Sequence, residues 1–332
     1  MFIPRLKKKH ILIAAAFSFI FIWRQSYVIS GPDLFHDLFD DNRTHDYKYL
    51  IKESEICKPF PDKIFLLITV FSRTSEFEER EAVRQTWGSM AVNNTEIRLA
   101  FILGYRPETS YVDIKTESEK YHDILQEDFY DSYRNLTIKS EAILRFANTF
   151  CQGVKYILKV DSDVFINIPL LIEELRKHDG RNMIMGNTEL CTLPFRNPKS
   201  KWYVDKITYP HAHFPRYAQG HAYVLSGDIT SQLLSVALKT KYLFLEDTFI
   251  TGIVRERAAV KLINHRGFDY WSLFLDSCWF KNRISGHYYT KEQIREIWLE
   301  QDQNKLCTWS LRIFYALCSQ ASITLGLFCS RV

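Results

Sequence analysis

The stretch "KYILKVDSDVFIN", Lys155–Asn167, decides the fold class of this chain. Tyr156–Leu158 and Val160 are strand formers and Val164–Ile166 are apolar, so the segment predicts a buried strand that ends in Asp161 and Asp163. Two carboxylates this close repel each other, and burying them without partners is costly. Either a positive group lies beside the pair, or the pair lies in water.

The sequence around this stretch alternates between strand patterns and helix patterns. Such alternation predicts an α/β domain with a mostly parallel mixed sheet that binds ligands at the carboxyl ends of its strands. Asp161 and Asp163 lie at such an end. The expected strands are 63–71, 97–104 and 155–167, and the expected helices are 74–88, 139–151, 169–178 and 290–301.

The N-terminal region has the pattern of a membrane anchor. Basic residues at Arg5–His10 precede the uncharged run Ile11–Trp23, which reaches a spanning length of about 20 residues if Arg24 snorkels. A cleaved signal peptide is the alternative, but no small-x-small cleavage site follows the apolar core. The predicted divisions are a cytosolic tail at 1–10, a signal-anchor transmembrane segment at 11–30 and a polar stem at 31–62.

Further features agree with a lumenal domain and a membrane partner. Asn42, Asn93 and Asn135 each begin an N-x-S/T glycosylation sequon. The seven cysteines form no CxxC pair, which favours disulfides in an oxidising compartment over a zinc site. With 46% hydrophobic residues the chain can bury a large core, and its net charge of +4 forms no basic stripe, so we expect no nucleic-acid partner.

The D-x-D at the strand end has two enzymatic interpretations. The acids could hold Mn²⁺ or Mg²⁺ against a nucleotide-sugar diphosphate, because hard cations bridge carboxylate and phosphate oxygens. In the phosphatase pattern D-x-D-x-[TV], by contrast, the first acid is a nucleophile, and Phe165 at the fourth position after Asp161 argues against it. Two solvated turn acids are the remaining interpretation.

Charged residues elsewhere suggest partners for this site. Arg80 and Arg84 lie on one face of the expected helix 74–88 and suit a diphosphate, although their spacing alone favours salt bridges to neighbouring glutamates. Glu246 and Asp247 follow another apolar run, so one could serve as a general base, while a helix N-cap is the alternative role for Asp247. The sequence predicts loop positions for the histidines His211, His213 and His221.

Six ordered segments between about 63 and 307 together resemble the β1,3-glycosyltransferase family of β1,3-galactosyltransferases and β1,3-N-acetylglucosaminyltransferases. The chain departs from the family pattern at Ser140, Ser162, Ala222 and Thr248, and it is longer between Pro210 and Tyr217. The matching segments are "REAVRQTWG" (80–88), "YRNLTIKS" (133–140), "KVDSDVFIN" (159–167), "KWYVDKITYPHAHFPRYAQGHAYVLSGD" (201–228), "LEDTFITG" (245–252) and "CWFKNRISGHYYTKEQIREIW" (278–298).

The resemblance implies a GT-A domain at 63–307 in a type II Golgi membrane enzyme with an inverting mechanism, Mn²⁺ and a UDP-sugar. By position, Asp163 and His287 would ligate the metal, and Asp161 would support the nucleotide ribose or the metal's water shell. Asp247 would be the catalytic base. The remaining implied roles are Glu246 beside the base, Arg80, Arg84, Lys139 and Gly220 toward the nucleotide-sugar, and a Cys278–Cys307 disulfide.

The resemblance also suggests the reaction. The E-D form at Glu246 and Asp247 resembles the galactosyl members, so we expect transfer of galactose from a UDP-hexose to the glycan of a glycoprotein or glycolipid in β1,3 linkage. The alternatives are a β1,3-N-acetylglucosaminyltransferase and a catalytically inactive membrane-anchored carbohydrate-binding protein. The apolar tail at 308–332, which has no charge between Ile313 and Cys329, departs from the family, and we expect a peripheral helix there rather than a spanning segment or an interaction helix.

Overall fold

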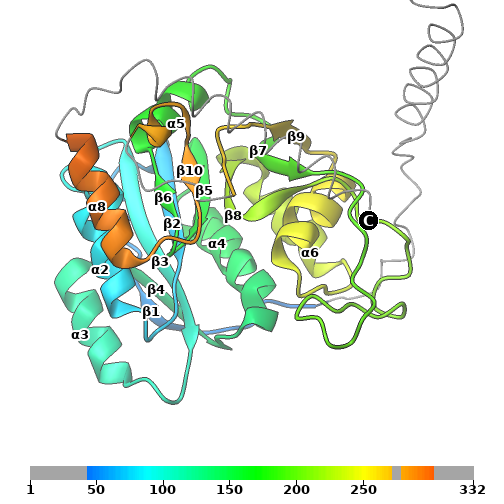
Figure 1. Cartoon of the computed structure of the whole chain (residues 1–332). Coiled ribbons are helices and arrows are strands. Elements are labelled where there is room, and N and C mark those ends of the chain that lie inside the picture. Colours follow the sequence, from blue (N-terminus) through cyan, green and yellow to red (C-terminus); the bar gives the residue numbers. More distant parts are fainter. Residues whose placement is uncertain (1–42, 271–277, 303–332) are drawn as a thin grey trace, which may run out of the picture. The chain divides into compact units, whose positions relative to one another are not determined.

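The computed structural model describes residues 43–270 and 278–302, which form an α/β domain around one mixed sheet (Figure 1). The order of the strands across the sheet is β1-β4-β3-β2-β5-β8-β7-β9. A two-stranded antiparallel ribbon, β6 with β10, lies beside it. The strands are β1 (Tyr49–Lys52), β2 (Leu66–Phe71), β3 (Ile97–Tyr105), β4 (Ile124–Tyr130), β5 (Tyr156–Asp161), β6 (Phe165–Ile166), β7 (Met183–Glu189), β8 (Tyr217–Ser226), β9 (Lys261–Asn264) and β10 (Ser285–Gly286).

Strand direction changes at the middle of the sheet. Strands β4, β3, β2 and β5 are parallel neighbours, whereas β8 runs antiparallel to both β5 and β7. Phe71 of β2 pairs with Asp161 of β5, and Val160 pairs with Ala222 of β8. The start of β8 therefore lies at the same edge as the carboxyl ends of β2 and β5.

Helices cover both faces of the sheet. Leu66, Ile68 and Val70 of β2 share a core cluster with apolar residues of α2, α5 and α8, while the buried Leu67 and Ile143 of α4 lie outside that cluster. Since side chains alternate along a strand, α4 and its neighbour α6 cover the opposite face. The longer helices are α2 (Phe77–Gln85), α3 (Tyr111–Tyr121), α4 (Leu136–Phe150), α5 (Ile168–Leu175), α6 (Thr230–Leu238) and α8 (Lys291–Asp302), and a π-helix, η6, spans Thr248–Val254.

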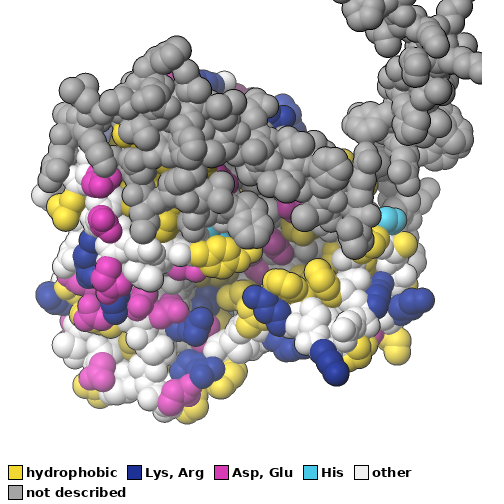
Figure 2. Space-filling view, viewed as in Figure 1, with side chains coloured by type: hydrophobic (Ala, Val, Ile, Leu, Met, Phe, Trp, Pro, Cys, Tyr) yellow, Lys and Arg dark blue, Asp and Glu magenta, His cyan; other side chains and the backbone are white. Residues whose placement is uncertain are grey.

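The predicted α/β class and mixed sheet are confirmed. The expected strands correspond to β2, β3 and β5, and the expected helices to α2, α4, α5 and α8. Acidic and basic side chains are interspersed over α2, α3 and α8 rather than gathered by sign (Figure 2).

The prediction of a stem at 31–62 is wrong for the second half of that segment, which belongs to the folded domain. Strand β1 pairs with β4 and adds an edge to the sheet. A disulfide joins Cys57 to Cys151 at the end of α4, so this segment is bound to the domain at a second point. The folded domain begins before 63 because these residues bury apolar and charged side chains against it.

Several predictions fall partly or wholly outside the described residues. The anchor at 11–30, the Asn42 sequon and the tail at 308–332 lie outside them, and no helix among the described residues is long and apolar enough to cross a membrane. Cys278 is disulfide-bonded, but its predicted partner Cys307 lies outside the described part of the chain.

The two described sequons differ in surroundings. Asn93 is exposed on a turn with a positive φ of 54°, so its side chain is accessible to glycosylation. Asn135 donates from Nδ2 to the Tyr130 carbonyl (2.8 Å), and the hydroxyl of Thr137 in the same sequon is buried on the Leu243 carbonyl. Both sites stay predictions, and Asn93 is the more accessible.

A buried charged cluster ties the segment before β1 to the domain. His45 Nε2 lies 2.6 Å from Glu127 Oε2 of β4, and Nδ1 lies 3.4 Å from Glu141 Oε2 of α4. Arg43 pairs with Glu141 at 2.8 Å and Arg145 with Glu127 at 2.9 Å. Burial by itself lowers the pKa of His45, but the hydrogen bonds and charges of the two glutamates outweigh it and raise that pKa above its usual value.

We expect His45→Gln to destabilise the protein by about 3 kcal/mol at acid pH, because it removes one partner of a buried ion pair. Since the folded-state pKa of His45 is raised, the stability from its charge is fully present below the unfolded pKa of about 6.5 and is lost as pH rises through the folded value. Thermal unfolding of the detergent-solubilised full chain at about pH 5.5 and about pH 8.5 measures the difference. The exposed His122, paired at the surface with Glu53, supplies the control His122→Gln, and an equal loss at both pH values would contradict the assignment.

Candidate active site

A cavity of about 920 Å³ opens at the carboxyl edge of β2 and β5, where the sequence places the D-x-D. Segments distant in the sequence meet around it because β8 enters this edge from the opposite direction. Its lining includes Phe71–Glu76, Asp131–Tyr133, Lys139, Lys159, Asp161–Asp163, Lys201, Trp202, Gly220, His221, Phe244–Asp247, Tyr270 and His287–Glu292.

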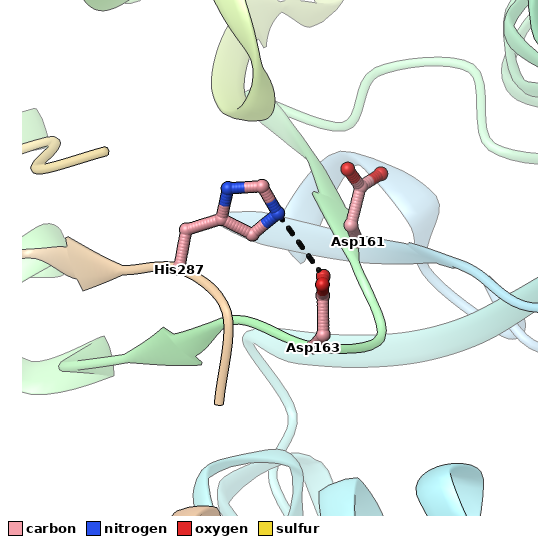
Figure 3. Close-up of side chains that lie close together, drawn as sticks. All are labelled: Asp161, Asp163 and His287. Carbon is pink, nitrogen blue, oxygen red and sulfur yellow. Dashed lines mark ion pairs between the residues drawn. The ribbon is translucent and has the colours of Figure 1, made fainter. Parts of the chain in front are cut away.

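Three potential metal ligands converge in this cavity (Figure 3). Asp161 ends β5, Asp163 lies in the turn that follows, and His287 follows β10. One ligand atom from each lies within 4.8 Å of the others, and His287 Nε2 is 3.3 Å from Asp163 Oδ1. The pairing of β10 with β6 brings His287 to the turn, since β6 begins two residues after Asp163. The structure therefore brings together all three residues predicted as metal ligands.

A buried lysine supplies the positive partner that the Asp161 carboxylate needs at this strand end. Lys159, on β5, is 2% exposed, and its ammonium lies 2.6 Å from Asp161 Oδ1 and 3.9 Å from Glu246 Oε2. It also donates to the Gly220 carbonyl. Burial lowers the pKa of Lys159, but the carboxylates of Asp161 and Glu246 outweigh this and raise it, so the ammonium stays charged. Sequence reasoning missed Lys159, although it lies two residues before Asp161 and therefore on the same face of the strand.

Glu246 is buried in a hydrogen-bonded setting. Its Oε1 accepts hydrogen bonds of 2.5 Å from Ser140 Oγ and from Tyr223 OH. Burial raises the pKa of Glu246 to about 7, while Lys159 and the two hydroxyls act in the opposite direction. Because both hydroxyls engage one oxygen and the side chain is 5% exposed, Glu246 is placed to support its neighbours rather than to meet a substrate.

Asp247 is the more accessible acid of the pair. It lines the cavity and caps the π-helix η6, where Oδ1 accepts from the Thr248 amide at 2.7 Å. Its Oδ2 accepts from the Gly220 amide at 3.1 Å. Thr251 bonds both the Asp247 carbonyl and Ala218 of β8, which fixes η6 against that strand. Burial raises the pKa of Asp247, and the two amides partly offset that shift.

A glycine at position 220 leaves room for the side chain of Asp247, which lies close to the Gly220 backbone. A Cβ at Gly220 would lie 3.2 Å from both Cβ and Oδ2 of Asp247, tighter than most real contacts. Its amide and carbonyl meanwhile contact Asp247 and Lys159. The structure thus places Gly220 in the cavity wall, and its predicted role toward the nucleotide-sugar stays a prediction.

The structure does not bring Arg80 and Arg84 to the cavity, and their role at the nucleotide stays a prediction. Arg80 is fully buried, pairs with Glu117 of α3 at 2.5 Å and donates to the Ser72 hydroxyl. Arg84 pairs with Glu117 at 2.7 Å and with Asp123 at 2.8 Å. Neither lines the cavity. The four-residue spacing placed both on one face of α2, but that face meets Glu117 of α3 and Asp123 before β4, which the local sequence does not reveal.

Lys139 does line the cavity, but its ammonium is engaged internally. It lies 2.8 Å from Asp131 Oδ1 and from the Ser72 carbonyl, at the carboxyl ends of β4 and β2. Burial lowers the pKa of Lys139, and Asp131 partly offsets this shift. Its predicted contact with the nucleotide-sugar stays a prediction, and its observed role is to join two strand ends.

The prediction that His221 is a loop residue is also wrong. His221 lies in β8, is 2% exposed and lines the cavity, with its ring near-parallel to that of His287 (centroids 5.5 Å apart, 22° between planes). Burial lowers its pKa well below the usual value. The alternation of Ala218, Gly220 and Ala222 with larger residues in "YAQGHAYVLS" was the available strand signal.

Comparison with known proteins decides the family of this chain. A galactosyltransferase family model matches residues 78–266. Beta-1,3-galactosyltransferase 1 of Homo sapiens is 32% identical over 268 residues, which cover 79% of this chain and 80% of that protein. The chain belongs to the β1,3-glycosyltransferase family. Beta-1,3-galactosyltransferase 2 of Homo sapiens is also 32% identical, over 79% of this chain and 64% of that protein.

The match to the galactosyltransferase family model begins within α2, covers β3 to β9 and most of the cavity wall, and ends before His287. Solved structures give more distant similarities. The galactosyltransferase LgtC in complex with donor and acceptor sugar analogs covers 74% of this chain at 12% identity with a TM-score of 0.37. That similarity is too low to bear on the geometry of the site.

We expect Arg80→Leu to lower stability by about 3 kcal/mol, because it leaves part of the buried Glu117 charge without a partner. The surface variant Arg176→Ala, which removes an exposed pair with Glu96 and a contact with the Phe65 ring, should change stability by less than about 0.5 kcal/mol. Chemical unfolding and UDP binding of both variants provide the measurement. If Arg80→Leu keeps the stability of the wild type but no longer binds UDP, Arg80 has a role at the nucleotide.

Proposed function

We propose that this protein is an inverting transferase that moves galactose from UDP-galactose to a hydroxyl of a glycan acceptor in β1,3 linkage. The family is one of hexosyltransferases, and the named relatives are beta-1,3-galactosyltransferases. The observation that carries the proposal is one cavity that holds both the Asp161–Asp163–His287 group and the accessible carboxylate of Asp247. A GT-A arrangement of the domain is part of the proposal.

The ligand group fits a divalent cation. Two carboxylates and one imidazole offer oxygen and nitrogen donors within 4.8 Å of one another, and the Asp163 side chain is 46% exposed, so a ligand in the cavity can reach it. An imidazole donor favours Mn²⁺ over Mg²⁺, which prefers oxygen ligands and retained waters. We propose Asp163 and His287 as ligands and Asp161, already paired with Lys159, as a supporting ligand or ribose contact. When bound, the cation would offset negative charge on the departing UDP.

The protein's own groups supply the remaining chemistry. Asp247 accepts the proton of the acceptor hydroxyl as that oxygen attacks the anomeric carbon, and the C1–O bond to UDP breaks on the opposite face. A raised pKa makes Asp247 a stronger base than a fully solvated aspartate. Glu246, held by Ser140 and Tyr223, keeps its neighbour Asp247 in place, and Lys159 holds Asp161. Tyr133 and Trp202 line the cavity as flat surfaces for sugar rings.

We further propose a Golgi membrane location with the domain in the lumen. The Cys57–Cys151 disulfide agrees with an oxidising compartment, and the exposed Asn93 sequon with glycosylation there. The predicted anchor at 11–30 would supply the membrane attachment.

We expect Asp247→Asn to reduce transfer by a factor of about 10²–10⁴ and to leave UDP binding unchanged, because the amide cannot accept the proton. UDP release measured with UDP-galactose and a glycan panel tests both the variant and the activity itself. Asp179→Asn, the same change at an exposed aspartate outside the cavity lining, is the matched control and should keep wild-type activity. The base assignment fails if the two variants lose equal activity. If the wild-type protein releases no UDP with any UDP-hexose and acceptor, the proposed function fails.

We expect Asp163→Ala to weaken Mn²⁺-dependent UDP binding by at least about tenfold while leaving thermal stability nearly unchanged, because its side chain is half-exposed and its recorded partner is His287. Titration calorimetry of UDP with and without Mn²⁺ gives the measurement. The exposed Asp179 serves for the control Asp179→Ala. Unchanged Mn²⁺-dependent binding would remove Asp163 from the metal site.

A further inference from the structure

The imidazole of His287 lies in a cluster of aromatic rings. The Tyr288 ring stacks on it with centroids 3.8 Å apart, and the His221 ring lies near-parallel at 5.5 Å, both at 22°. The edge of Tyr270 meets the rings of His287 and His221 at 5.1 and 5.5 Å. Tyr288 is exposed, whereas His221 is 2% exposed and fixed in β8. His221 is therefore the rigid member of the cluster.

His221 is also within hydrogen-bond distance of β10, the strand that directly precedes His287. Its Nε2 lies 3.1 Å from the Ser285 hydroxyl, and Ser285 begins β10, two residues before His287. Strand β10 pairs with β6, which follows Asp163. The bond to Ser285 therefore ties β8 to the ribbon that brings His287 and Asp163 together.

The neighbour of His221 connects the same strand to the other parts of the site. The Gly220 amide donates to Asp247, and the Gly220 carbonyl accepts from Lys159, which pairs with Asp161. Two consecutive residues of β8 thus contact the proposed base, the lysine that holds Asp161, and the histidine of the proposed metal group. A displacement of β8 here would disturb all three together.

We propose that His221 is a positioning residue for the metal ligand His287, an inference that rests on the proposed metal site. An imidazole on a chain segment can turn about two side-chain bonds, and holding one orientation costs conformational entropy. The ring contact of His221 restricts the His287 ring, and its bond to Ser285 restricts the backbone before it. Together they keep Nε2 of His287 directed at Asp163, as outer partners of a ligating histidine do at metal sites.

The two contacts of His221 can be separated by substitution. His221→Phe keeps a flat ring and removes the bond to Ser285, His221→Gln keeps a polar group for Ser285 and removes the ring, and His221→Ala removes both. His213→Ala is the matched control, because His213 is an exposed histidine of the same sequence region and its observed bond uses its backbone carbonyl.

Electron paramagnetic resonance of Mn²⁺ with UDP present measures both affinity and ligation in the full chain. Free Mn²⁺ gives the dissociation constant, and nitrogen modulation of the bound-ion signal reports a coordinated imidazole. We expect His221→Ala to weaken Mn²⁺ binding by about 10–100-fold and to diminish the nitrogen signal. His221→Phe and His221→Gln should each lose part of the affinity, and His213→Ala should match the wild type.

The outcomes separate this inference from the proposed function. If Asp163→Ala and His287→Ala abolish Mn²⁺ binding while His221→Ala keeps wild-type affinity and nitrogen signal, the positioning role is overturned and the metal site stands. If the wild-type protein binds no Mn²⁺, the proposed metal site fails first and the positioning role with it. Thermal unfolding identifies a variant that does not fold. In that case His221→Phe and His221→Gln decide, and wild-type affinity in both would overturn the role.

Discussion

The buried ammonium of Lys159 is the interaction on which the site depends. It lies among the Asp161 carboxylate, the Glu246 carboxylate and the Gly220 carbonyl, three groups from three separate segments. An acid buried at a strand end is costly without such a partner, and so is a buried lysine. Each group therefore compensates the others, and the cluster holds the ends of β5 and β8 together beside the Glu246–Asp247 segment.

Strand β8 organises the rest of the cavity because it runs against its neighbours. In a wholly parallel sheet, the carboxyl edge would receive only strand ends and the loops that follow them. Here β8 enters at that edge, so backbone groups within a strand contact the cavity. Gly220 permits the approach of Asp247, and His221 contacts the ring of His287. Contact with a central strand therefore restricts the movement of site groups that lie in loops or at the start of a helix.

Several arginines lie outside the cavity lining because they pair with acids inside the domain. Arg80 and Arg84 share Glu117, and Arg43 and Arg145 pair with the two glutamates that enclose His45. These guanidinium groups are committed to acids inside the domain. Groups free to meet a ligand are instead those at the cavity surface, such as the half-exposed Asp163 and the carboxylate of Asp247.

The sequence by itself determined the α/β class, the strand that ends in Asp161, and the residue types of the site. These follow from local patterns: apolar runs with period two or 3.6, capping residues, and acids at a strand end. Local patterns also indicated Asp163 and Asp247, whereas His287 was found only through the resemblance to a family, and the structure brings Asp163 and His287 within ligand distance.

Only the tertiary structure decided which charges face one another. Glu117 and His221 carry no local signal of their partners, since those partners lie on other strands and helices. Lys159 shares β5 with Asp161, but its other partners, Glu246 and Gly220, come from distant segments. For the same reason the spacing of Arg80 and Arg84 fixed a helix face without showing what that face meets. A sequence pattern reports the periodicity of one element, whereas pairing of buried charge depends on how elements far apart in the chain come together.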